Sequence, residues 1–195
     1  MKTLSKQWRS AFHALIRRSE NAKVLQAAIE GNVLTDWTAA LTDVVVATCQ
    51  HMNWSASARG HKSDLLPISK SEYLHIDVMA FAAETLQTWQ LPVAVFELEN
   101  QFDDTYIAYD LWKILCVHAK LRMVFCYRKS TRENPALIRF LNNTVIQALS
   151  PADLDAMQGE TLVVIGNKGE AATFPSGYFH WWYLDRELLK FKKLA

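Results

Sequence analysis

Apolar positions recur along the chain with two different periods, and the alternation between these periods predicts an α/β protein. Residues 3–30 carry apolar side chains every three to four positions, as in an amphipathic helix, with a break near Ser19 and an end at Gly31-Asn32. A second helix is expected from residue 35 or 36, as its N-cap, to about residue 52. The front of the chain is therefore predicted to be helical.

Beyond residue 70 the period shortens to two, which is typical of strands. Residues 53–70 are polar and contain Gly and Pro, so this segment is predicted as a loop. Helices are expected at 105–119 and 134–149, and the segment after 185 fits either state. Strands are expected at Tyr73–Phe81, Leu91–Asn100, Leu121–Tyr127, Leu162–Ile165 and Gly177–Leu184. The order strand, strand, helix, strand suits a crossover helix between parallel strands.

Length, charge and cysteine content narrow the class of protein. The chain has 195 residues, enough for one domain with a sizeable core, and a net charge of +1. A nucleic-acid contact would therefore need a local basic patch. No run of apolar residues approaches a membrane span, and the three cysteines, in apolar settings, are expected to be small buried thiols. We expect a soluble cytoplasmic protein that does not contact a membrane.

Two glutamates at the end of an apolar strand are the first candidate chemistry. In the stretch LPVAVFELENQ, strand geometry places Val93, Val95, Glu97 and Glu99 on one face. Two adjacent carboxylates in such surroundings cost several kcal/mol or take up protons. Three arrangements would relieve that cost: a strand end that reaches solvent, basic partners, or a cation between the two carboxylates.

Asp77 favours the cation. It interrupts the preceding apolar strand, two residues after His75 and 20 positions before Glu97. If the two strands are neighbours, three carboxylates converge at one place. Oxygen-rich clusters of this kind bind hard cations such as Mg²⁺ or Mn²⁺.

These residues resemble a known superfamily. The IDV around Asp77, the FELEN at 96–100 and the helix DLWKIL at 110–115 are similar to the motifs of the PD-(D/E)xK nuclease superfamily. The resemblance implies the restriction-endonuclease-like fold, a mixed β-sheet flanked by helices. The whole chain, 1–195, would be a single domain. Its core would span about 35–130, with an N-terminal helical segment at 3–30 and a C-terminal β addition at 160–195.

The resemblance assigns roles to individual residues. Asp77 matches the aspartate of the family, and Glu97 matches the first acidic position of its second motif. Glu99 stands where the family usually has lysine, and it would serve as metal ligand or base. Lys113 would supply the missing charge from the helix, although an exposed helix lysine is the simpler alternative. Asp43 is the candidate for an acidic residue on the first core helix.

The implied function is a nuclease that depends on Mg²⁺ or Mn²⁺ and hydrolyses phosphodiester bonds, in DNA rather than RNA. Asp77, Glu97, Glu99 and Lys113 would be catalytic, and the three acidic residues would bind the metal. A catalytically inactive nuclease-fold module that serves binding or assembly is the alternative, because the usual lysine is missing. The chain has no recognisable domain for reading a base sequence, so a homodimer or a partner protein in a larger system is expected.

Two further groups of residues have open interpretations. Arg128 and the charged positions that follow it are expected either to meet phosphates or to be solvated. The aromatic run at 181–183 would stack on bases or pack into the core. Adjacent strand residues point to opposite faces, which favours the core.

Overall fold

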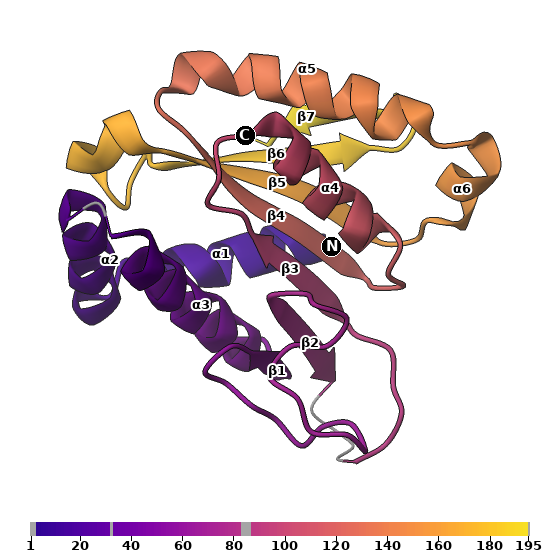
Figure 1. Ribbon diagram of the computed structural model, residues 1–195, viewed down its shortest axis with the longest axis horizontal. Helices are drawn as coiled ribbons and strands as arrows, with labels where there is room; N and C mark the ends of the chain where they lie inside the picture. The colour runs from indigo at the N-terminus through magenta and orange to yellow at the C-terminus, as the bar shows by residue number, and fades with distance from the viewer. Residues whose placement is uncertain (1–2, 32, 83–86, 195) are drawn as a thin grey trace.

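The computed structural model describes residues 3–31, 33–82 and 87–194, and its centre is one seven-stranded sheet (Figure 1). The helices are α1 (Leu4–Ile16), α2 (Ser19–Gly31), α3 (Leu34–His51), α4 (Asp104–Leu115), α5 (Asn134–Thr144) and α6 (Pro151–Ala156), with 3-10 turns at Thr131–Glu133, Ile146–Ala148 and Lys168–Thr173. The strands are β1 (Trp54–Ala58), β2 (Val78–Ala82), β3 (Ala94–Leu98), β4 (Leu121–Arg128), β5 (Glu160–Asn167), β6 (Phe179–Asp185) and β7 (Lys190–Lys193). Within the described segments, no helix combines the length and the apolar character needed to cross a membrane.

The strands follow one another across the sheet in chain order, with mixed directions. β1, β2 and β3 are antiparallel neighbours, β3, β4 and β5 run parallel, and β5, β6 and β7 are antiparallel again. Parallel neighbours require a crossover, and α4 joins β3 to β4 as predicted for 105–119. The prediction of an α/β protein with a mixed sheet and an N-terminal helical segment is confirmed.

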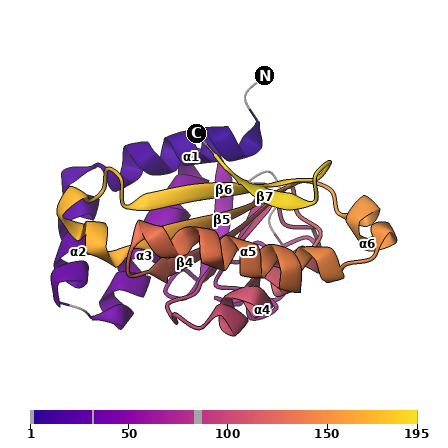
Figure 2. The same cartoon turned by 90° about the horizontal axis from the view of Figure 1, so that it is seen from above.

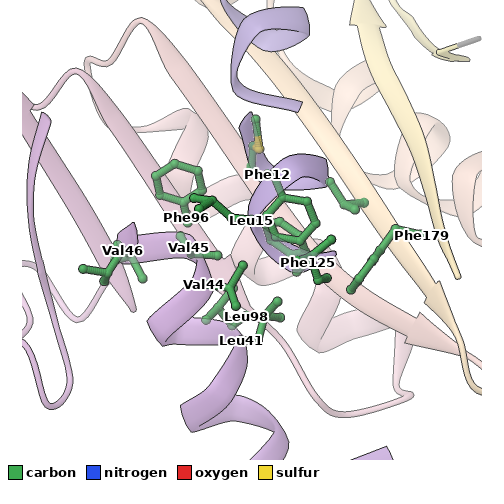
Figure 3. Packing of buried hydrophobic residues seen from close by; sticks show 14 of the residues in the cluster. Phe12, Leu15, Leu41, Val44, Val45, Val46, Phe96, Leu98, Phe125 and Phe179 are labelled. Atoms are coloured by element: carbon green, nitrogen blue, oxygen red, sulfur yellow. The ribbon is translucent and has the colours of Figure 1, made fainter. Parts of the chain in front are cut away.

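Helices cover both faces of the sheet. α1 and α3 lie over one face and α4 and α5 over the other (Figure 2). In β3, Phe96 and Leu98 face the first layer and pack with Phe12 of α1 and Val45 of α3 (Figure 3). Val95 faces the second layer instead, with residues of α4. The alternation predicted for this strand is confirmed, and it directs odd-numbered residues toward α4.

The helical front of the chain differs from the prediction at its boundaries. The break near Ser19 is confirmed, because α1 ends at Ile16 and α2 begins at Ser19. α2 ends at Gly31, and Asn32 lies outside the described residues. α3 already starts at Leu34 with Val33 as its N-cap, so the expected N-cap at 35 or 36 is wrong by two or three residues. The position before the helix is Val33, whose side chain offers no cap.

The predicted strand at Tyr73–Phe81 is wrong in its first half. Leu74 and His75 adopt left-handed backbone angles, with φ of 56° and 54°. Two such residues in succession turn the chain and cannot continue an extended strand. β2 therefore begins only at Val78, and Asp77 is the last residue before it.

Three short elements were not predicted. β1 lies inside the expected loop 53–70 and pairs with β2 at the edge of the sheet. α6 follows Ser150, whose hydroxyl accepts from the Asp153 amide in a capping box, so Pro151 begins a helix there. β7 resolves the segment after 185 as a strand.

The cysteines divide into two kinds. Cys49 and Cys126 are buried, as expected, and burial raises the pKa of each thiol to about 12. Cys116 is exposed, and the prediction that it is buried is wrong. Cys116 is the C-cap residue of α4. Its side chain is exposed because no further helical turn follows to cover it.

Candidate active site

Glu97 is the most deeply buried carboxyl group of the predicted site. It lies in β3 opposite Val124 of β4, points toward α4, and is only 2% exposed. The pKa of Glu97 is raised to about 9, chiefly by burial; Lys113 opposes this rise, and the nearby Asp77 and Asp110 contribute to it. A charge at this position is therefore unfavourable unless a cation accompanies it.

Lys113 of α4 supplies a cation. Its Nζ lies 2.8 Å from Glu97 Oε1 and 3.2 Å from Asp110 Oδ1, and it donates to the His75 carbonyl at 3.1 Å. The contact with Glu97 is an ion pair without a well-aligned hydrogen bond, since Glu97 Oε1 has no hydrogen-bond partner among the described residues. Lys113 is 20% exposed in its side chain. Its position is therefore that of a partner for Glu97 rather than of an exposed helix lysine.

Asp77 lies beside β3, at the start of the neighbouring strand. Its Oδ2 accepts a hydrogen bond of 2.7 Å from the backbone amide of Leu98, the residue after Glu97. The turn at Leu74 and His75 places Asp77 beside Leu98 of β3. Its charge raises the pKa of both Glu97 and Asp110, which shows that the three carboxyl groups share one neighbourhood.

Asp110 belongs to the site and was not predicted from the sequence. It lies on α4 one turn before Lys113 and is buried, and burial raises its pKa to about 6. Lys113 opposes that shift, whereas Glu99 and Asp77 add to it. The signal was the helical period: Asp110 is three residues after Ile107, on the side of the helix that is otherwise apolar.

Glu99 stands at the edge of the same group, just after β3. Its amide donates to the Phe125 carbonyl at 2.9 Å, and its Oε1 accepts from the Gln101 amide at 2.6 Å. The side chain is half-buried, and its charge raises the pKa of Asp110. We call Asp77, Glu97, Glu99, Asp110 and Lys113 the acidic cluster.

The donor chemistry of the acidic cluster suits a hard divalent cation, because carboxylate oxygens are the ligands that Mg²⁺ and Mn²⁺ prefer. The one ammonium group contacts two carboxyl groups, Glu97 at 2.8 Å and Asp110 at 3.2 Å. Asp77 and Glu99 lie near these two, so the charged forms of the four carboxyl groups exceed the positive charge available. Through residues 3–31, 33–82 and 87–194, no group of three or more His, Cys, Asp or Glu side chains is arranged to hold a metal ion. The shared three-carboxylate site stays a prediction, and the fit of Mg²⁺ or Mn²⁺ rests on the donor chemistry around Glu97.

Comparisons with known proteins supply no further assignment. Neither protein-family models nor curated proteins nor solved structures give a significant match to this chain. The chemistry of the acidic cluster is therefore inferred from its own geometry.

The other candidate residues lie in different surroundings. Asp43 is exposed on α3 and pairs with His61 at 2.7 Å. Arg128 is buried and pairs with Asp104 at the start of α4, so the alternative that it is solvated is wrong, and the contact with phosphates stays a prediction. Trp181 is in the core, as favoured for the aromatic run.

Proposed function

We propose that the chain is a divalent-metal-dependent nuclease that hydrolyses phosphodiester bonds in DNA, with the acidic cluster as its active site. The observation that carries the proposal is the buried Glu97 carboxyl group. Lys113 lies 2.8 Å from it, and the amide of the following residue, Leu98, donates a hydrogen bond to Asp77. The element order strand, strand, helix, strand from β2 to β4 supports the likeness to the restriction-endonuclease-like fold. Mg²⁺ or Mn²⁺ is the implied cofactor.

Each residue of the acidic cluster has a part in this proposal. Asp77 and Glu97 would hold the metal, and Glu99 would serve as a further ligand or as a base for the attacking water. A bound metal would polarise the phosphate and lower the pKa of a coordinated water. Lys113 places positive charge beside Glu97, where a phosphate would also need it. Asp110, one turn earlier on α4, orients the ammonium group.

The alternative is a catalytically inactive module of the same fold that serves binding or assembly. Two observations favour it. Lys113 already neutralises Glu97, and no group of three metal-ligating side chains is arranged for a metal within the described parts of the chain. In that case Lys113 substitutes for the metal and the acidic cluster is a structural ion-pair network.

Metal-dependent cleavage tests the proposal. Supercoiled plasmid and single-stranded DNA are incubated with the wild-type protein in Mg²⁺, Mn²⁺ or EDTA, beside the variants Glu97→Gln and Asp77→Asn. The proposal expects cleavage in either metal that EDTA and both substitutions abolish. Glu187→Gln, in the exposed turn between β6 and β7, is the matched control and should cleave like the wild type.

Calorimetric titration with Mn²⁺ separates the two functions. Binding that Asp77→Asn abolishes supports the nuclease. Absence of both Mn²⁺ binding and cleavage contradicts the nuclease and favours the inactive module. Cleavage that survives Glu97→Gln does the same, because it would come from a contaminating nuclease.

A further inference from the structure

A basic groove lies on the face of the sheet opposite the acidic cluster. It runs between α1 and the β6–β7 strands, which lie side by side in Figure 2, and encloses about 1000 Å³ of open space. Its walls are formed by Lys6, Arg9, Ser10, His13, Ala14, Arg17, Gly177, Phe179, His180, Trp181, Lys193 and Leu194. We call this surface the basic groove.

The helix side of the basic groove is a stripe of cationic and imidazole side chains. Lys6, Arg9, His13 and Arg17 are spaced by three, four and four residues, so they share one side of α1. The opposite side of the helix, including Phe12, is buried in the core. From Lys6 to Arg17 the stripe extends for roughly 16 Å along the helix axis.

The strand side is formed by Phe179 and Trp181 of β6, which face α1, and the Arg9 guanidinium lies 5.8 Å from the centre of the Trp181 ring. His180 and Lys193 also line the groove, but strand alternation directs their side chains to the other face of the sheet, where Lys193 lies across from Trp182. Four of the lining residues are lysine or arginine and none is acidic, whereas the whole chain has a net charge of only +1. The basic groove is thus the local patch that binding of a polyanion would require.

Glu160 and Glu170 are acidic groups near the basic groove. Glu160 caps the start of α1, accepting from the Leu4 amide at 2.8 Å and from Ser5. Burial and then Arg9 and Arg17 lower the pKa of His13 to about 4. Burial and then Lys193 lower the pKa of His180, and Glu170 only opposes this. Burial is the larger cause of both shifts, and the neighbouring cations act in the same direction.

We propose that the basic groove binds the phosphate backbone of a nucleic-acid strand without reading its sequence. Spaced cations along an open groove match a repeating phosphate chain, and the aromatic rings at its base are buried, so base stacking is not available. The exposed large apolar residues of the described chain lie elsewhere, which disfavours insertion into a membrane. The inference does not depend on the proposed nuclease, because the two sites occupy opposite faces of the sheet.

Salt-dependent binding of oligonucleotides tests the proposal. Fluorescence anisotropy with labelled 15-mers of single-stranded DNA, single-stranded RNA and duplex DNA is measured in EDTA between 50 and 200 mM salt. If Lys6, Arg9 and Arg17 contact phosphates of a single strand, log K falls with log salt at a slope of about −2.1, or about 18-fold over this range. Both single strands should bind irrespective of base sequence.

Paired substitutions assign the binding to the basic groove. Lys6→Gln with Arg17→Gln removes two exposed cations and should reduce the slope to about −0.7, which is about 2.6-fold over the same range. Lys62→Gln with Lys120→Gln removes two exposed lysines elsewhere and should leave the slope unchanged. Circular dichroism confirms that both variants fold.

Three outcomes would overturn the proposal. One is an absence of oligonucleotide binding at 50 mM salt, and another is an equal loss in the control pair. The third is preferential binding to vesicles of anionic phospholipid that the paired groove substitutions abolish, which would assign the groove to a lipid surface. A protein that does not cleave DNA can still bind oligonucleotides through the basic groove. Failure of the nuclease proposal is therefore distinguishable from failure of this one.

Discussion

Replacing Glu97 by glutamine should change how the stability of the protein depends on pH. The substitution keeps the shape of the side chain and removes its ability to ionise. Glu97 is 2% exposed, and burial raises its pKa from 4.5 to about 9. In the folded, metal-free protein burial thus favours the protonated carboxyl group at neutral pH, against the attraction of the Lys113 ammonium group at 2.8 Å, whereas in the unfolded chain the carboxyl group has lost that proton.

The sign and size of the effect follow from proton linkage. Between pH 4.5 and about 9 the folded state binds one more proton at Glu97 than the unfolded state, so stability falls as pH rises. The slope is about −1.4 kcal/mol per pH unit, which amounts to about 3 kcal/mol between pH 6.5 and 8.5. This contribution to stability is fully present below the unfolded pKa and is lost as pH rises through the folded one. Asp110 has a pKa of about 6, so most of its own effect lies below this range.

Urea denaturation in EDTA at several pH values between 6.5 and 8.5 measures the difference. The wild type should lose stability relative to Glu97→Gln by about 1.4 kcal/mol for each pH unit. The control Glu187→Gln should run parallel to the wild type. Mn²⁺ that binds the ionised carboxylate should flatten the wild-type slope. Parallel curves for wild type and Glu97→Gln would refute this reasoning, because they would show that Lys113 keeps Glu97 ionised throughout.

Two further predictions concern stability away from the acidic cluster. Gly166→Ala should cost about 1–3 kcal/mol in urea denaturation, since its new Cβ would lie 2.7 Å from the buried Tyr127 ring. Gly31→Ala, whose nearest neighbouring atom is 3.6 Å away, should instead stabilise by about 0.5–1 kcal/mol. Arg128→Met should cost about 2–3 kcal/mol, because the buried guanidinium also donates to the Tyr127 carbonyl at 2.7 Å. Asp104→Asn, at the partly exposed end of the same ion pair, should cost less than about 1 kcal/mol, and a larger loss than that of Arg128→Met would contradict this ranking.

The sequence predicted those elements whose apolar period is long and unbroken. α4, β4 and α5 begin within a residue of their expected starts, because the helical or alternating pattern there is enforced by burial against one face of the sheet. β1 escaped prediction because four of its five residues, WSASA, are serine or alanine and give no clear apolar alternation. Its strand conformation depends on pairing with β2, a tertiary contact that no local pattern reports.

The sequence predicted the carboxylates Asp77, Glu97 and Glu99 of the candidate site. It did not predict how their charges are compensated. The alternating period placed Glu97 on the buried face of β3 correctly. The approach of Asp77 depends on the left-handed turn at Leu74 and His75, and leucine rarely adopts that conformation, so no local pattern indicated it. Asp110 was missed because a single acidic residue on an amphipathic helix normally marks its solvent side, and only the packing of α4 reveals otherwise.

The position of Lys113 reduces the two candidate functions to one physical question. A buried glutamate at the end of a strand needs solvent, a basic partner or a metal, and the structure provides the basic partner. One ammonium group compensates one carboxylate, while Asp77, Glu99 and Asp110 add negative charge around it. If the surplus is relieved by protons, the acidic cluster is a structural network and stability falls with pH in the presence or absence of Mn²⁺. If a divalent ion displaces those protons, the same carboxylates become ligands and the pH dependence disappears when the metal is added. The pH dependence of stability with and without Mn²⁺ therefore distinguishes a metal site from a structural ion-pair network even where no substrate has been identified.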